Sequence, residues 1–137
     1  MGRTDPLPRD SLVGVHVLVV DDDPDARQVI RAVLQYCGAL VTTAESAPDA
    51  LTILERVVPD VLIVDILLPE HDGYWLIREI RRRPRELGGA IPALACTAYH
   101  EEEQPAGRLL AAGFQAHARK PIDPWELARV VATLSRG

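Results

Sequence analysis

Residues 15–24 read VHVLVVDDDP, and this stretch decides the fold. The β-branched run at 15–20 predicts a buried strand. Asp23 then has the side chain of a helix N-cap, and Pro24 suits the first position of a helix. Apolar residues recur at helical spacing as far as Cys37, and the glycine that follows is a helix stop signal. A strand followed at once by a helix indicates the repeating unit of a parallel sheet.

The rest of the chain repeats this alternation of strand and helix. Further strands are predicted at residues 40–44, 61–64, 92–96 and 115–118. Helices are predicted over about residues 24–37, 46–58, 73–83, 106–112 and 124–134. Strands and helices that alternate in this way are typical of a doubly wound α/β domain with right-handed crossovers. We therefore expect a five-stranded parallel sheet in the flavodoxin-like order 2-1-3-4-5, flanked by five helices.

Length and composition indicate one folded domain. The chain has 137 residues, of which 47% are hydrophobic and 26% charged. Residues 1–12 contain two prolines and no hydrophobic period, so we expect a flexible lead-in there and one domain over 13–137. The two cysteines, Cys37 and Cys96, are too few for a disulfide framework, and we expect both in the core.

The sequence also limits location and partners. It shows neither a secretory signal nor an apolar run long enough for a membrane span, so we expect a cytoplasmic protein without one. The net charge of −5 argues against direct nucleic-acid binding by this domain. The arginine run at 81–85 is interpreted as the complement of a helix C-terminus, with nucleic-acid binding as the weaker alternative.

Polar side chains follow the predicted strands where each strand ends. Asp21 and Asp22 follow the first strand and Asp65 the third. Thr97 follows the fourth strand and Lys120 the fifth. In the order 2-1-3-4-5, the first and third strands are neighbours, and ligands bind in the crevice at this switch point. We therefore expect the three aspartates to converge at the carboxyl edge of the sheet.

Such a cluster has a definite chemistry. Three converging carboxylates repel one another unless one is protonated or a cation neutralises them, and oxygen ligands of this kind suit Mg²⁺. Lys120 is the one lysine in a chain with 14 arginines, and a compact ammonium suits a point contact with a phosphoryl group. Thr97 offers a hydroxyl donor to a phosphoryl oxygen. This set of groups indicates phosphoryl transfer to an aspartate.

Four motifs carry a resemblance to a known family. They are VLVVDDD at 17–23, VLIVDILLPEHDG at 61–73, ALACTAY at 93–99 and the KP dipeptide at 120–121. In order and spacing, the chain from about residue 15 to residue 134 resembles the receiver domain of bacterial two-component response regulators. The resemblance covers nearly the whole chain.

The resemblance implies a role for each matching residue. Asp65 is implied as the phospho-acceptor, Thr97 as the switch hydroxyl and Lys120 as the partner of the phosphoryl group. Three residues before the lysine, where the family usually has tyrosine or phenylalanine, this chain has His117. His117 is interpreted either as part of the switch or as a half-exposed strand residue.

The same resemblance implies a Mg²⁺ site. Asp22 is expected to bind the ion directly, and Asp21 to hold its water ligands. Asp65 and the backbone carbonyl of Leu67 complete the implied set.

The implied donor is a histidine kinase or a histidine phosphotransfer protein. An output domain or target protein is expected on the face made by the fourth helix, fifth strand and fifth helix. Two alternatives stay open. One is a Mg²⁺-dependent phosphatase or phosphotransferase with an aspartyl-phosphate intermediate, although its DxDxT pattern lacks the threonine at 21–25. The other is a pseudo-receiver that binds partners without being phosphorylated.

Overall fold

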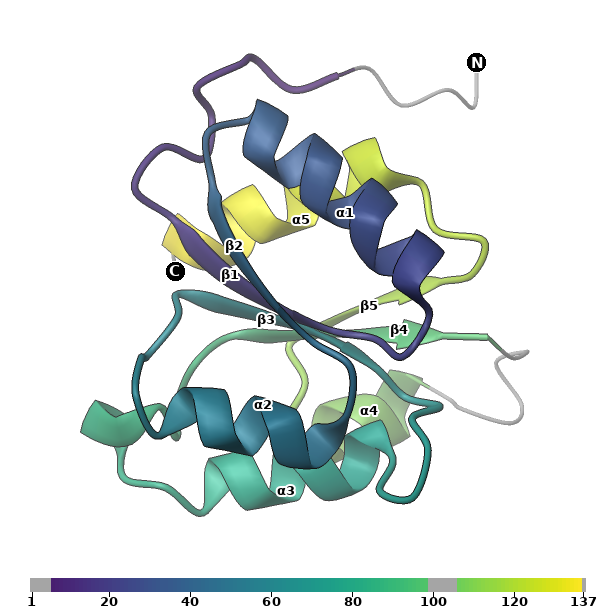
Figure 1. Ribbon diagram of the computed structural model, residues 1–137. Coiled ribbons are helices and arrows are strands. Elements are labelled where there is room, and N and C mark those ends of the chain that lie inside the picture. Colours follow the sequence, from purple (N-terminus) through teal and green to yellow (C-terminus); the bar gives the residue numbers. More distant parts are fainter. Residues whose placement is uncertain (1–5, 99–105, 137) are drawn as a thin grey trace.

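The computed structural model describes residues 6–98 and 106–136, which form one parallel sheet between two layers of helices (Figure 1). The strands are β1 (His16–Val20), β2 (Leu40–Ala44), β3 (Val61–Asp65), β4 (Ala93–Thr97) and β5 (Ala116–Arg119). The helices are α1 (Pro24–Tyr36), α2 (Ala47–Leu54), α3 (Gly73–Arg81), α4 (Ala106–Ala112) and α5 (Pro124–Arg136), with a 3₁₀ turn η1 (Arg85–Leu87). The strand order β2-β1-β3-β4-β5 confirms the predicted topology.

The core lies on both faces of the sheet, as expected for a parallel sheet covered by crossover helices. Helices α1 and α5 cover one face, and α2, α3 and α4 cover the other (Figure 1). Successive side chains of β3 alternate between the two layers: Leu62 and Val64 pack with α2 and α3, whereas Val61 and Ile63 pack with α1 and α5. All five residues of β3 are buried, so the strand that ends in Asp65 is fixed from both sides.

Helix starts follow the sequence signals. The Asp23 side chain accepts a hydrogen bond of 3.0 Å from the Asp25 amide at the start of α1. Ser46 accepts one of 3.2 Å from the Asp49 amide at the start of α2. Each of these bonds satisfies an amide that the first helical turn leaves without an intrahelical partner. The predicted N-cap role of Asp23 is thereby confirmed.

The end of α2 differs from the prediction. The helix ends at Leu54 instead of near residue 58, and Val58 is half exposed where a buried position was expected. Pro59 disfavours helical backbone at the residue before it. The guanidinium of Arg83 donates to the Leu54 carbonyl at 3.3 Å and also reaches that of Leu51, so this earlier end keeps hydrogen-bond partners.

The N-terminal segment packs against the domain before residue 13, where the domain was expected to start. Leu12 is fully buried, and its amide donates to the Cys37 carbonyl at 2.8 Å. Leu7 packs against the same core layer, and the Arg9 guanidinium lies over the Tyr36 ring. Of the expected lead-in 1–12, residues 1–5 lie outside the described part of the chain.

Gly73 brings the start of α3 against the exit of β3. Its amide donates to the Ile66 carbonyl at 2.8 Å. A Cβ atom at this position would lie 2.8 Å from the Asp65 carbonyl oxygen and 2.8 Å from the Ile66 Cα. Only glycine therefore permits this approach, which holds the backbone after Asp65 in place.

We predict that Gly73→Ala lowers the free energy of unfolding by about 1–3 kcal/mol, because the added methyl group overpacks against backbone. Gly107→Ala is the matched control: no atom lies within 4 Å of its Cβ position, so it is expected to be neutral or slightly stabilising. Urea denaturation of both variants and the parent measures the difference. Equal stability of Gly73→Ala and the parent would contradict the close approach.

Candidate functional site

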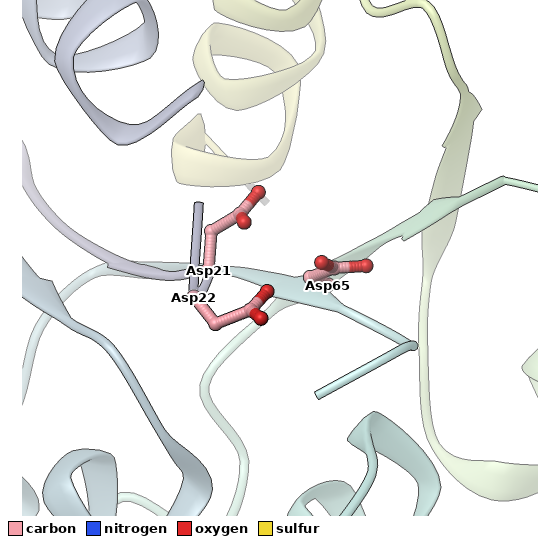
Figure 2. A group of neighbouring side chains, drawn as sticks. All are labelled: Asp21, Asp22 and Asp65. Carbon is pink, nitrogen blue, oxygen red and sulfur yellow. The ribbon is translucent and has the colours of Figure 1, made fainter. Parts of the chain in front are cut away.

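Three carboxylates meet at the carboxyl ends of β1 and β3 (Figure 2). One oxygen from each of Asp21, Asp22 and Asp65 lies within 4.8 Å of the others. Asp21 and Asp65 are buried, with 3% and 2% of their surface exposed, whereas Asp22 is exposed. The parallel pairing of β1 with β3 produces the cluster, since Val20 is in register with Val64 and the aspartates follow directly. The sequence predicted this convergence.

Backbone hydrogen bonds hold the two buried aspartates. The Asp21 amide donates to the Ala44 carbonyl at 3.1 Å, and the Asp21 carboxylate accepts from the Asp23 amide at 2.9 Å. The Asp65 carboxylate accepts from the Leu67 amide at 3.1 Å. Each buried carboxylate therefore has a donor close to it in the chain, which compensates part of the cost of burying its charge.

Lys120, which follows β5, reaches the cluster, and its backbone is bound to Thr97 at the end of β4. The Lys120 ammonium lies 3.1 Å from a carboxylate oxygen of Asp65 and forms an ion pair with it. The Lys120 amide donates to the Thr97 carbonyl at 2.7 Å, and Thr97 is buried at the last position of β4. Lys120 thus contacts Asp65 directly through its side chain and is bound to Thr97 through its backbone.

The site has more negative than positive groups. Burial raises the pKa of Asp21, as do the charges of Asp65 and Asp22, although the Asp23 amide and Lys120 oppose this shift. Burial lowers the pKa of Lys120, but its hydrogen bond to Asp65 and the negative charges nearby outweigh burial, and the net shift is upward. Lys120 therefore stays a cation, and a further cation would relieve the repulsion that remains among the carboxylates.

His117 is exposed on β5, an edge strand of the sheet. It lines a groove of about 310 Å³ together with Thr97 and residues of α5. It also lines a smaller groove of about 170 Å³ beside Leu109 and Leu110 of α4. His117 thus lines the same groove as Thr97. Tyr99, the last residue of the third motif, lies outside the described residues.

Sequence reasoning missed one residue of the site, Arg27. Its guanidinium donates to the Asp21 carbonyl at 2.7 Å. Arginine on the polar side of a helix is common, and the spacing from Asp21 to Arg27 carries no motif that predicts a bond to backbone. Only the folded loop reveals the contact.

Comparison with known proteins identifies the family. The family model of the response regulator receiver domain matches residues 17–132. An uncharacterized 14.6 kDa protein from Leptolyngbya boryana is 45% identical over 121 residues, which cover 88% of this chain and 90% of that protein. A probable transcriptional regulator, ycf27, from Guillardia theta is 35% identical over 123 residues. That match covers 88% of this chain but 45% of ycf27, so the chain spans about half the length of this larger relative.

Solved structures of similar proteins support the same family. A putative response regulator from Chloroflexus aurantiacus is 32% identical, with a TM-score of 0.82 over 90% of this chain and 98% of that one. The receiver domain of sensor histidine kinase PA1611 from Pseudomonas aeruginosa is 32% identical, with a TM-score of 0.80 over 91% and 100%. That structure has a magnesium ion coordinated in its active site cleft. In the described part of our chain, no helix is both long and apolar enough to cross a membrane. The chain belongs to the response regulator receiver domain family of two-component signalling systems.

Proposed function

We propose that Asp65 accepts a phosphoryl group from a histidine kinase or a histidine phosphotransfer protein. The observation that carries this proposal is the placement of the Asp65 carboxylate. It is buried at the end of the central strand, 3.1 Å from the Lys120 ammonium and within 4.8 Å of two further carboxylates. A carboxylate held between a fixed cation and a cation-binding cluster is suited to attack a phosphoryl group.

Each neighbour of Asp65 has a role in this proposal. Lys120 binds a phosphoryl oxygen as a point charge, and Thr97 donates its hydroxyl to another. The Leu67 amide, which donates to Asp65 at 3.1 Å, keeps the carboxylate oriented. His117 is proposed to respond to a change at Thr97, because the two side chains line one groove.

The donor atoms fit Mg²⁺. The cluster consists of carboxylate oxygens alone, and hard cations prefer such ligands. Asp22 and Asp65 would hold the ion with the Leu67 carbonyl, and Asp21 would hold its water ligands. When bound, Mg²⁺ offsets the charge of the carboxylates and of the phosphoryl oxygens.

The chain is proposed to act as a signalling module of the cytoplasm, without turnover of a small substrate. Phosphorylation of Asp65 is expected to change the face formed by α4, β5 and α5, where an output domain or target protein binds. Exposed side chains on this face include Leu110 of α4 and His117 of β5. Turnover of a small phosphoester would instead favour the phosphatase alternative, and failure to accept phosphate would favour a pseudo-receiver.

We predict that acetyl phosphate with Mg²⁺ labels the parent once and that Asp65→Asn abolishes the label, because the amide is not a nucleophile. Asp25→Asn is the control, since Asp25 is an exposed aspartate in the first turn of α1. Intact-mass spectrometry counts the added phosphoryl groups. Full labelling of Asp65→Asn would refute the assignment of the acceptor.

We predict that Asp22→Ala weakens Mg²⁺ binding by more than about tenfold, the size of loss that even an outer partner of a metal ligand causes. Because its side chain is exposed, the substitution is expected to leave the fold intact. Isothermal titration calorimetry with MgCl₂ gives the dissociation constant, and Asp25→Ala serves as the charge-matched control. If both variants bind Mg²⁺ like the parent, Asp22 is not a ligand.

We predict that Lys120→Arg slows phosphorylation by roughly ten- to a hundredfold although it keeps the charge. The planar guanidinium is larger than the ammonium and displaces the groups around Asp65. Arg78→Lys, on the exposed side of α3, is the reciprocal control. The rate of phosphoprotein formation from acetyl phosphate is measured for each variant. Parent-like rates in Lys120→Arg would show that charge alone suffices at this position.

A further inference from the structure

Arg27 makes two contacts with the loop that carries the acidic cluster. Its backbone amide donates to the Asp23 carbonyl at 3.0 Å, which is the first hydrogen bond of α1. Its Nη1 donates to the Asp21 carbonyl at 2.7 Å, a short bond for a charged donor. One residue of the helix therefore closes the loop from Asp21 to Asp23 at both of its ends.

These contacts act on the peptide between the two neighbouring aspartates. Because a peptide unit is planar, fixing the Asp21 carbonyl oxygen also fixes the direction of the Asp22 amide and Cα. The Asp21 amide is bound to the Ala44 carbonyl at 3.1 Å, so the preceding peptide is fixed as well. Two successive peptides are thus held, one by β2 and the other by Arg27.

Asp22 depends on this backbone more than its neighbours do. Asp21 and Asp65 are buried, so packing restricts their carboxylates, whereas Asp22 is exposed. Its oxygen nevertheless lies within 4.8 Å of the other two carboxylates, against their repulsion. The direction of the main chain at Asp22 therefore largely determines where its carboxylate lies, and Arg27 sets that direction.

Arginine is suited to this task. Its guanidinium keeps its charge at all physiological pH values and presents several donors in one plane. Arg27 is partly buried and lines a surface groove together with Thr43 of β2 and with Glu45, which follows this strand.

We propose that Arg27 is a positioning residue for the metal site: its bond to the Asp21 carbonyl keeps Asp21 and Asp22 in the arrangement that binds Mg²⁺. This inference rests on the proposed Mg²⁺ site. It adds a residue that touches neither the ion nor the phosphoryl group and acts through the peptide between two ligand residues.

The test compares Arg27→Met, which keeps the length of the side chain and loses its donors, with Arg31→Met. Arg31 lies about one turn further along α1 and lines the same surface groove as Arg27, so this control removes an equal charge from the same helix face. We expect Arg27→Met to raise the Mg²⁺ dissociation constant about tenfold and Arg31→Met to leave it within about twofold. Arg27→Lys keeps one charged donor and is expected to restore most of the affinity.

A second measurement needs no metal. Hydrogen exchange of the Asp21 and Asp23 amides, followed by NMR without Mg²⁺, is expected to be about tenfold faster in Arg27→Met and unchanged in Arg31→Met. Thermal unfolding midpoints of the variants show whether a loss of affinity reflects global destabilisation. A parent protein that binds no Mg²⁺ would refute the proposed metal site. The exchange rates would still test whether Arg27 orders the loop.

Four results would overturn the inference. The first is parent-like Mg²⁺ binding in Arg27→Met. The second is an equal loss in Arg31→Met, which would assign the effect to charge alone. The third is a loss in Arg27→Met that Arg27→Lys does not reduce. Unchanged exchange of both amides in Arg27→Met would overturn it as well.

Discussion

The parallel pairing of β1 with β3 is the constraint on which the site depends. The register that aligns Val20 with Val64 places Asp21 and Asp65 at the same edge of the sheet, although they are far apart in the sequence. A slip of one residue would turn the side chains of a strand to its other face and would separate the carboxylates. Burial of β3 on both faces prevents such a slip, because all four of its apolar side chains pack in one of the two core layers.

This constraint concentrates negative charge where burial makes it costly. The surrounding residues limit the cost with fixed donors: the Asp23 and Leu67 amides and the Lys120 ammonium. Cys96, in register with Asp65 on β4, adds no charge, because burial and the neighbouring carboxylates raise its pKa to about 12. The excess of carboxylates over cations is therefore local and directed at the open edge of the sheet, which is where a divalent ion and a phosphoryl group would meet it.

Sequence reasoning captured the parts of this arrangement that depend on local rules. Strand periodicity, the Asp23 cap and the order of the strand-end polar residues sufficed for the topology and for the convergence of the aspartates. Sequence reasoning failed where segments that are distant in the sequence determine the local structure. The end of α2 depends on Arg83, which lies beyond the end of α3 and 29 residues from Leu54 in the sequence, and the packing of Leu12 depends on the Cys37 carbonyl. The contact of Arg27 with Asp21 depends on the shape of a loop, which no periodicity encodes.

The unequal use of arginine and lysine follows from the same geometry. Arg27, Arg81 and Arg83 each donate to backbone carbonyls at the ends of helices, strands or loops. Arg81 reaches the carbonyls of both Gly113 and Gly89 with different nitrogens of its guanidinium, which a single compact ammonium does poorly. At Asp65 the proposed function reverses the requirement, since one carboxylate would have to be neutralised while space remains for a phosphoryl group. A planar fork there would occupy that space, so the single lysine stands where the proposed function calls for a compact charge.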